Sequence, residues 1–296
     1  MLTLPSSSNK VGIEIQCWQR GSAEYPTELL DLRHPPFELY AMGRAAALTK
    51  PRVAIVGTRN STAYGERITR SLTRSLVRAG ASVVSGMARG IDGAAHRTAL
   101  EEGGNTVAVL GTGIDVPYPV GHRQLHRAIA ERGLVVSENQ PGMRAQKGAF
   151  PKRNRIIAAL APVTIVVEAG FRSGALNTAS QALELGRTVA AVPGPIDSEQ
   201  SRGSNQLLRD GAVLIAAADD ALTLLGLSAS ADHGAATPLL PDTEQRVWDA
   251  TDKGFIEMDS LPATTGLTMA ECLGAVTSLE ILGLVECSLA GEVRRR

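Results

Sequence analysis

The chain has few of the residues that build disulfide scaffolds, zinc sites or membrane segments. Its three cysteines, Cys17, Cys272 and Cys287, are odd in number and widely spaced, which argues against a disulfide framework and leaves no zinc-type pair. Its longest apolar run, residues 156–167, contains Pro162 and is too short to cross a bilayer. No N-terminal stretch has the pattern of a signal peptide. We therefore expect a cytoplasmic protein without a membrane segment.

The chain also has few aromatic side chains and no net charge. Aromatics make up 3% of the chain and the formal net charge is zero, which by itself speaks against a nucleic-acid partner. The charges are uneven, however, because residues 241–296 carry ten acids and five bases, so residues 1–240 hold 25 bases against 20 acids. The larger part of the chain is therefore the basic part.

What the chain does have is a regular alternation of short Val- and Ile-rich runs with helical segments. This pattern predicts repeated βα units that build a parallel sheet buried on both faces. The strands are expected at residues 53–56, 82–85, 106–110, 134–137, 163–167, 188–191 and 212–215. Open sheets of this kind bind ligands at the carboxyl ends of their strands, so the loops there are the expected functional region.

Composition divides the chain into four segments. Residues 1–50 are interpreted as an extended arm that packs on the sheet domain, and residues 51–226 as that domain. Residues 227–241 are small, polar and proline-ended, which is typical of a linker. Residues 242–296 are expected to form three helices, 243–250, 260–265 and 269–282, and a strand pair, 284–288 and 292–295. Three helices with a small hairpin predict a winged helix.

Two glycine-rich loops follow the first two predicted strands. Loops of this kind bring backbone N–H groups close to an anion, and their arginines can clamp a phosphate. Neither is a dinucleotide fingerprint, which needs Gly-x-Gly-x-x-Gly and an acid at the end of the second strand. The candidate binding residues here are Gly57, Thr58, Arg59, Ser85, Gly86, Arg89 and Gly90.

A basic segment and a Ser-Gly loop flank the fifth predicted strand. The segment offers positive charge to a nucleic-acid backbone, and its phenylalanine offers a face on which a base can stack. The loop opens an Ala-rich helix, and a helix N-terminus attracts anions. The candidate residues are Phe150, Lys152, Arg153, Asn154, Arg155, Ser173 and Gly174. Together with Arg59 and the second glycine loop, they form a rim long enough to follow several phosphates of a single strand.

Other polar residues have structural interpretations that we prefer. Asp92 is expected to cap a helix and His96 to pack within the sheet domain. His122 and His126 have the spacing of helical metal ligands, but the Glu of a metalloprotease helix is missing. For the loop that contains Arg202, a phosphate contact and a structured turn remain equally open. We expect no catalytic residue, no metal and no cofactor.

Six ordered blocks of this sequence resemble the DNA-processing protein A family (DprA/Smf). They are VAIVGTR at 53–59, SGMARGIDGAAH at 85–96, 107–119 with its Tyr118-Pro119, FPKRNRII at 150–157, VEAGFRSGALNTA at 167–179 and GRTVAAVPG at 186–194. Thr58 stands where the family commonly has Ser, which keeps the hydroxyl. The resemblance implies an α/β fold, namely an extended Rossmann-like domain with a parallel sheet and a small C-terminal winged-helix domain.

The resemblance also implies a function. Members of this family act in natural transformation, bind single-stranded DNA without base specificity, form homodimers and load the recombinase RecA, with no accepted enzymatic step. The rival interpretation is a nucleotide or nucleoside-phosphate hydrolase of the lysine-decarboxylase-like type. That group has a Pro-Gly-Gly-x-Gly-Thr motif with a downstream Glu, whereas this chain has EAGFRSG at 168–174.

The predicted recognition helix of the winged helix, residues 269–282, carries Glu271 and Glu280 and no Lys or Arg. A helix without basic residues is poorly suited to enter a DNA groove. We therefore expect this domain to contact protein.

Overall fold

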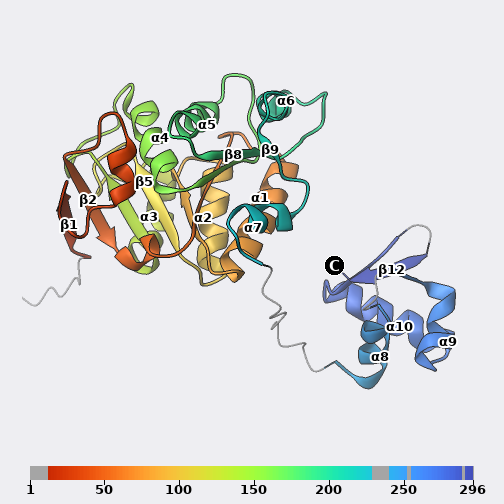
Figure 1. The fold of residues 1–296 in the computed structure, drawn as a ribbon. Helices are drawn as coiled ribbons and strands as arrows, with labels where there is room; N and C mark the ends of the chain where they lie inside the picture. The colour runs from red at the N-terminus through yellow and green to blue at the C-terminus, as the bar shows by residue number, and fades with distance from the viewer. Residues whose placement is uncertain (1–12, 229–239, 252–254, 289–290, 296) are drawn as a thin grey trace, which may run out of the picture. The chain divides into compact units, whose positions relative to one another are not determined.

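A nine-stranded sheet lies at the centre of the larger part of the protein (Figure 1). The computed structural model describes residues 13–228, 240–251, 255–288 and 291–295. The strand order is β1-β2-β6-β5-β4-β3-β7-β8-β9, with β1 and β2 antiparallel at one edge and the other strands parallel. The strands are β1 (Ile15–Gln19), β2 (Glu38–Gly43), β3 (Arg52–Val56), β4 (Ser82–Ser85), β5 (Thr106–Leu110), β6 (Leu134–Ser137), β7 (Val163–Val166), β8 (Thr188–Ala191) and β9 (Val213–Leu214).

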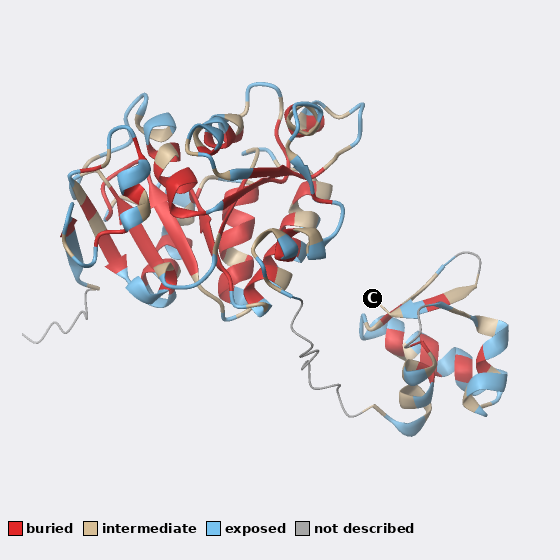
Figure 2. Ribbon diagram, in the orientation of Figure 1, coloured by how far each residue is buried: buried red, intermediate tan, exposed pale blue. Residues whose placement is uncertain are grey.

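The central strands are apolar on both faces because helices cover both sides. In β3, Val53 and Ile55 pack in one core, whereas Ala54 and Val56 pack in another on the opposite face. Figure 2 shows this as nearly continuous burial along the middle strands. The strands therefore read as unbroken Val and Ile runs, which is what parallel pairing between two helical layers requires.

Helices α1, α2, α3 and α7 contribute to the cores on one face, and α4 and α5 to the core on the other. The Thr62 side chain caps α1 by accepting a hydrogen bond from the Gly65 N–H at 3.1 Å. The helices are α1 (Ala63–Arg78), α2 (Ile91–Glu101), α3 (Arg123–Arg132), α4 (Ala149–Leu160), α5 (Gly174–Glu184), α6 (Arg202–Arg209) and α7 (Ala218–Leu224).

The predicted parallel sheet is confirmed, and the seven predicted strands correspond to β3 through β9. The N-terminal residues differ from an extended arm, because they contribute β1 and β2 to the sheet. Tyr25, Leu29 and Leu39 of this segment are buried in the core that also holds α4. β1 buries only Trp18, so its sequence lacks the two-residue alternation by which a strand is recognised.

The chain divides into two units, Met1–Ser230 and Ala231–Arg296. The smaller unit has the predicted winged-helix elements and a three-stranded sheet of order β10-β12-β11. Its core includes Val247, Leu261, Cys272 and Val293. The elements are α8 (Asp242–Ala250), β10 (Phe255–Glu257), α9 (Leu261–Thr265), α10 (Met269–Ile281), β11 (Val285–Cys287) and β12 (Glu292–Arg295). Most of the predicted linker, residues 229–239, lies outside the described residues.

Among the described residues, no helix combines the length and apolar character that a bilayer crossing requires.

Candidate functional site

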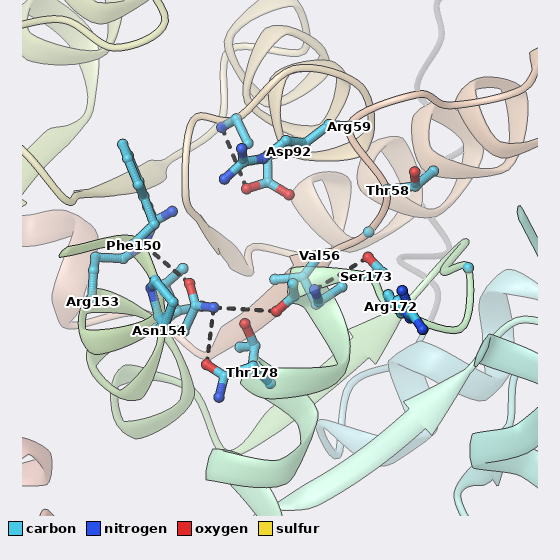
Figure 3. Close-up of a pocket in the computed structure, with 18 of the residues that line it drawn as sticks. Val56, Thr58, Arg59, Asp92, Phe150, Arg153, Asn154, Arg172, Ser173 and Thr178 are labelled. Carbon is cyan, nitrogen blue, oxygen red and sulfur yellow. Dashed lines mark hydrogen bonds between the residues drawn. The ribbon is translucent and has the colours of Figure 1, made fainter. Parts of the chain in front are cut away.

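The loops at the carboxyl ends of the parallel strands surround a cavity of about 500 Å³ (Figure 3). It lies where the strand order reverses, since β4, β5 and β6 follow on one side of β3 and β7 and β8 lie on the other. Ligands of open α/β sheets bind at such a switch point. Eight of the predicted residues line this cavity: Gly57, Thr58, Arg59, Phe150, Arg153, Asn154, Ser173 and Gly174.

A second cavity of about 370 Å³ continues the first, because the two share lining residues that include Arg59, Phe150 and Arg153. It adds the predicted residues Gly86 and Arg89, and also Tyr118. We call the two cavities together the central groove. The fold thus brings residues of the two glycine loops and of the Ser-Gly loop together with Phe150, Arg153 and Asn154 of the basic segment.

Phe150 forms an aromatic wall shared by both cavities. The Arg59 guanidinium carbon lies 5.6 Å from the Phe150 ring centroid, within the range of a cation–π contact. The Tyr118 ring lies 4.9 Å from the Phe150 ring, with 36° between the planes. An exposed arginine beside an aromatic pair can hold a phosphate and a planar base at neighbouring positions.

Arg153 forms part of the floor of the groove and is only 4% exposed. Its Nη1 donates hydrogen bonds to the carbonyls of Gly86 (2.7 Å) and Val109, and its Nε donates to Asn154 Oδ1 at 3.2 Å. Asp92 Oδ2 accepts from the N–H of the same Gly86 at 3.2 Å. The Gly86 residue is therefore held at its carbonyl by a buried cation and at its amide by a buried carboxylate.

Burial perturbs both of these ionisable groups. It lowers the pKa of Arg153 to about 10, an effect that the nearby Asp92 charge opposes. It raises the pKa of Asp92, while Arg153 and the backbone N–H groups of Ala88, Gly86 and Gly57 act in the opposite direction. A guanidinium with a pKa near 10 remains charged at neutral pH, so Arg153 places a buried positive charge beneath the groove, next to the Asp92 carboxyl.

The glycines of the two loops accommodate protein atoms. A Cβ at Gly57 would overlap the Ile91 side chain, and Gly90, with φ of +70°, would direct a Cβ into the Thr58 carbonyl. The Ile91 N–H also donates to Thr58 O at 3.3 Å. These close approaches pack the β3–α1 loop against the β4–α2 loop and place Arg59 beside Ala88 and Phe150 along the groove.

Glu168 joins the loops that follow β3 and β7. It is 2% exposed, and its carboxylate accepts hydrogen bonds from the Thr62 N–H at 2.9 Å and the Thr62 hydroxyl at 2.7 Å. Its backbone carbonyl accepts from the Thr58 N–H at 2.7 Å. With both carboxylate oxygens engaged in this way, Glu168 ties the β7–α5 loop to the β3–α1 loop.

Lys152 and Arg155 share one carboxylate. Both form ion pairs with Glu138, whose side chain is 7% exposed; the Lys152 side chain is 65% exposed and that of Arg155 is 14% exposed. Of the three cations predicted in the basic segment, only Lys152 is thus well exposed. Lys152 and Arg155 do not line the central groove. Both line a separate cavity near Phe37.

Several other predicted residues hold the loops in place. The buried Ser85 hydroxyl donates to the Ile55 carbonyl at 2.6 Å. Ser173 caps α5 by accepting from the Ala175 N–H at 3.3 Å. Asn154 Nδ2 donates to Gly174 O and to Asn177 Oδ1, both at 3.2 Å, as the dashed lines in Figure 3 show. These contacts tie α4 to the start of α5.

The groove residues that were not predicted include Asn60, Tyr118 and Arg172. Arg172 is exposed in the β7–α5 loop, directly before the predicted Ser173 and Gly174. Its position after a predicted strand was a signal that could have identified it. Tyr118 had no such signal, since the contact with Phe150 depends on the path of the long β5–α3 connection.

The histidines have the structural surroundings that were expected. His96 is fully buried and its Nδ1 lies 2.7 Å from the Thr106 hydroxyl. His122 Nδ1 lies 3.0 Å from the Met87 carbonyl and His126 Nε2 lies 2.8 Å from that of Ile114. No cluster of three His, Cys, Asp or Glu side chains suited to hold a metal ion occurs in the described part of the chain.

Two family models match the chain. The model described as DNA recombination-mediator protein A matches residues 16–226, and the one described as DprA winged helix domain matches residues 231–291. A putative DNA processing protein DprA from Mycobacterium tuberculosis is 45% identical over 262 residues, covering 86% of this chain and 67% of the relative. The DNA processing protein DprA from Streptococcus pneumoniae is 43% identical over 202 residues, covering 67% and 70%.

Two solved structures are similar to the larger part of the chain. The X-ray structure of DprA from Streptococcus pneumoniae aligns with a TM-score of 0.69 and 40% identity, covering 71% of this chain and 74% of that one. A structure of DprA from Helicobacter pylori, reported with its single-stranded DNA binding mode, aligns with a TM-score of 0.66 and 31% identity, covering 72% and 96%.

Proposed function

The chain belongs to the DNA recombination-mediator protein A family, as its motifs predicted, and from this premise we propose that it binds single-stranded DNA through the central groove. The observation that carries the proposal is the combination of exposed arginines, Arg59, Arg89 and Arg172, with the Phe150–Tyr118 aromatic pair. The binding would be independent of base sequence, because arginines contact phosphates and every base has a face that stacks.

The three arginines support this proposal because their charges are not paired with a described carboxylate. The arginines that form ion pairs among the described residues are all other ones. No described carboxylate oxygen therefore lies within 4.0 Å of a guanidinium nitrogen of Arg59, Arg89 or Arg172. Each therefore brings an uncompensated positive charge to the groove, above the buried charge of Arg153. The shared Phe150 wall favours a single strand, because a base must leave its pairing partner to stack there.

The test is fluorescence anisotropy of a labelled oligo-dT at two salt concentrations. Arg59→Ala should weaken binding to all sequences alike and reduce the salt slope by about 0.7, the value for one phosphate contact on a single strand. Lys152→Ala should have a smaller effect, because Glu138 already pairs with Lys152. Arg127→Ala, which removes an 81%-exposed arginine side chain from α3, is the matched control. Equal affinity and slope for Arg59→Ala and the control would refute the proposal.

We further propose that the protein delivers the bound strand to RecA in the cytoplasm during natural transformation and recombination, and that it acts as a homodimer without a reaction of its own. Family membership supports this role. The measurement is the rate of RecA assembly on DNA coated with a single-strand-binding protein. Acceleration by the wild type and none by Arg59→Ala is the expected result, and sedimentation measures the oligomeric state.

The winged-helix unit is proposed to contact protein. Helix α10 has no basic residue and exposes Met269, Leu273 and Ile281, which are 38%, 48% and 81% exposed. Apolar side chains on a helix whose charged residues, Glu271 and Glu280, are both acidic favour a protein surface over a phosphate backbone. Leu273→Glu should leave oligo-dT binding unchanged and reduce the acceleration of RecA assembly.

A hydrolase is not favoured by the site. The rival enzyme class needs a carboxylate that can act on substrate, whereas the Glu168 carboxylate is buried and accepts two hydrogen bonds from Thr62. Release of free base from nucleoside monophosphates by the purified protein would contradict the proposed binding role.

A further inference from the structure

A third cavity, of about 270 Å³, extends the central groove on its β7 side. It shares Thr58, Asn60 and Gly170 with the main cavity and adds Phe171, Glu199, Gln200 and Arg202. Because the two cavities have three residues in common, the third cavity lies next to the main cavity, on the side of the β7–α5 loop.

Phe171 is 73% exposed at this position, in a protein with only four phenylalanines. The exposure does not come from an unsupported loop. The Ser173 N–H donates to Gly170 O at 3.0 Å, and the Gly203 N–H of α6 donates to Ala169 O at 2.7 Å. The backbone on both sides of Phe171 is thus fixed while the ring faces solvent beside the third cavity, where a planar base could stack on it.

The charges around Phe171 suit a phosphate. Arg172 is exposed and pairs with no described carboxylate, and Arg202 forms only a long 3.7 Å contact with Glu199. The side chains of that pair are 62% and 80% exposed, so solvent screens their attraction. A phosphate between Arg172 and Arg202 would therefore meet little competition from Glu199.

A second exposed phenylalanine, Phe37, provides a comparison. It lines the separate cavity of about 370 Å³ with Glu38, Glu138, Lys152 and Arg155. Its two cations are matched by two carboxylates, and its lining residues include none that line the central groove. Phe37 thus has the ring, and the Arg20 guanidinium carbon lies 5.7 Å from its centroid, but its cavity has no continuity with the central groove.

We propose, building on the function proposed above, that Phe171 is a second base-stacking residue and that Arg172 and Arg202 hold the phosphates beside it. The bound strand then runs from the Phe150–Tyr118 pair, past Arg59 and Thr58, to Phe171. The two stacking residues, Phe150 and Phe171, then define the path that the strand takes across the carboxyl edge of the sheet.

The test compares Phe171→Ala with Phe37→Ala by anisotropy, using oligo-dT of about 16 nucleotides and an abasic oligonucleotide of equal length. Phe171→Ala should lose about tenfold in affinity for oligo-dT, within the range of one lost stacking contact, and should match the wild type on the abasic strand. Phe171→Tyr should restore binding, whereas Phe37→Ala should bind like the wild type. Unchanged oligo-dT affinity of Phe171→Ala, an equal loss on the abasic strand, or a loss in Phe37→Ala alone would overturn the inference.

A spectroscopic measurement follows the ring directly. In Phe171→Trp, the added indole should be quenched when oligo-dT binds, and subtraction of the wild-type signal removes the contribution of Trp18 and Trp248. Absence of quenching in a variant that binds oligo-dT would also overturn the inference. A wild type that does not bind oligo-dT would instead refute the proposed function itself, so the two failures are distinguishable.

Discussion

Replacement of Arg153 by Met should destabilise the larger unit rather than simply remove a DNA contact. Methionine keeps most of the side-chain volume, but it leaves the carbonyls of Gly86 and Val109 and the Asn154 amide oxygen without the donor they have now. It also leaves Asp92 buried beside no cation. Loss of the donor to a buried acceptor costs about 1–3 kcal/mol, and three acceptors lose theirs here, so the urea midpoint should fall strongly.

The pH dependence of this loss separates charge from packing. Burial already raises the pKa of Asp92, and Arg153 is the largest influence that lowers it, so the pKa should rise further in Arg153→Met. A carboxyl with a raised folded-state pKa costs stability above that pKa and none once it is protonated. The destabilisation should therefore shrink as the pH falls, and the added change Asp92→Asn should recover about 1–3 kcal/mol as a coupling energy.

Urea unfolding of the wild type, the two single variants and the double variant measures this cycle, and oligo-dT binding is measured well below the unfolding midpoint. Arg59→Ala serves as the comparison, because Arg59 is exposed and should lose affinity with little loss of stability. An Arg153→Met variant of wild-type stability that loses as much DNA affinity as Arg59→Ala would show that the buried, structural assignment of Arg153 is wrong.

Two further predictions concern buried polar groups of the same unit. Burial lowers the pKa of His96 to about 3, below its value in an unfolded chain. The free energy of unfolding should therefore be highest above about pH 6.5 and should fall by about 2 kcal/mol by pH 5. Urea midpoints measure this loss, which should be absent in His96→Gln. Glu168→Gln keeps the shape but replaces an oxygen that accepts from Thr62 with a donor, so we expect a loss of about 1–3 kcal/mol in the same assay, and unchanged stability would contradict the tie between the two loops.

The fold could be predicted from the sequence because its strands are buried on both faces. Runs such as Val53–Ile55–Val56 need no knowledge of partners, since helices on either side demand apolar residues at every position. β1 is an edge strand with Trp18 as its one buried residue, so it has no comparable periodicity, and β2, which lies between β1 and β6, was missed with it. The two strands are defined by the neighbours they pair with, which sequence alone does not give.

The position of the candidate site could be predicted from the sequence, but the exposure and contacts of each of its residues could not. Rules of chain topology located the glycine loops at the carboxyl edge, and they lie there. Whether a cation is exposed depends on its direction from the helix, however, and adjacent residues of α4 differ: the Lys152 side chain is 65% exposed and Arg153 is 4% exposed. The ion pairs with Glu138 and the stacking of Tyr118 on Phe150 join distant segments, so only the folded chain reveals them.

The hydrogen bond from Arg153 to the Gly86 carbonyl affects how much entropy the protein loses when it binds DNA. Helix α4 carries Phe150 at its start and Arg153 one turn later, so the wall and the floor of the groove belong to one rigid element. Because Arg153 also secures the neighbouring loop, the shape of the surface is established before any strand arrives. The entropy lost on association should then fall mainly on the DNA, and hydrogen exchange of the β4–α2 loop should change little when DNA binds.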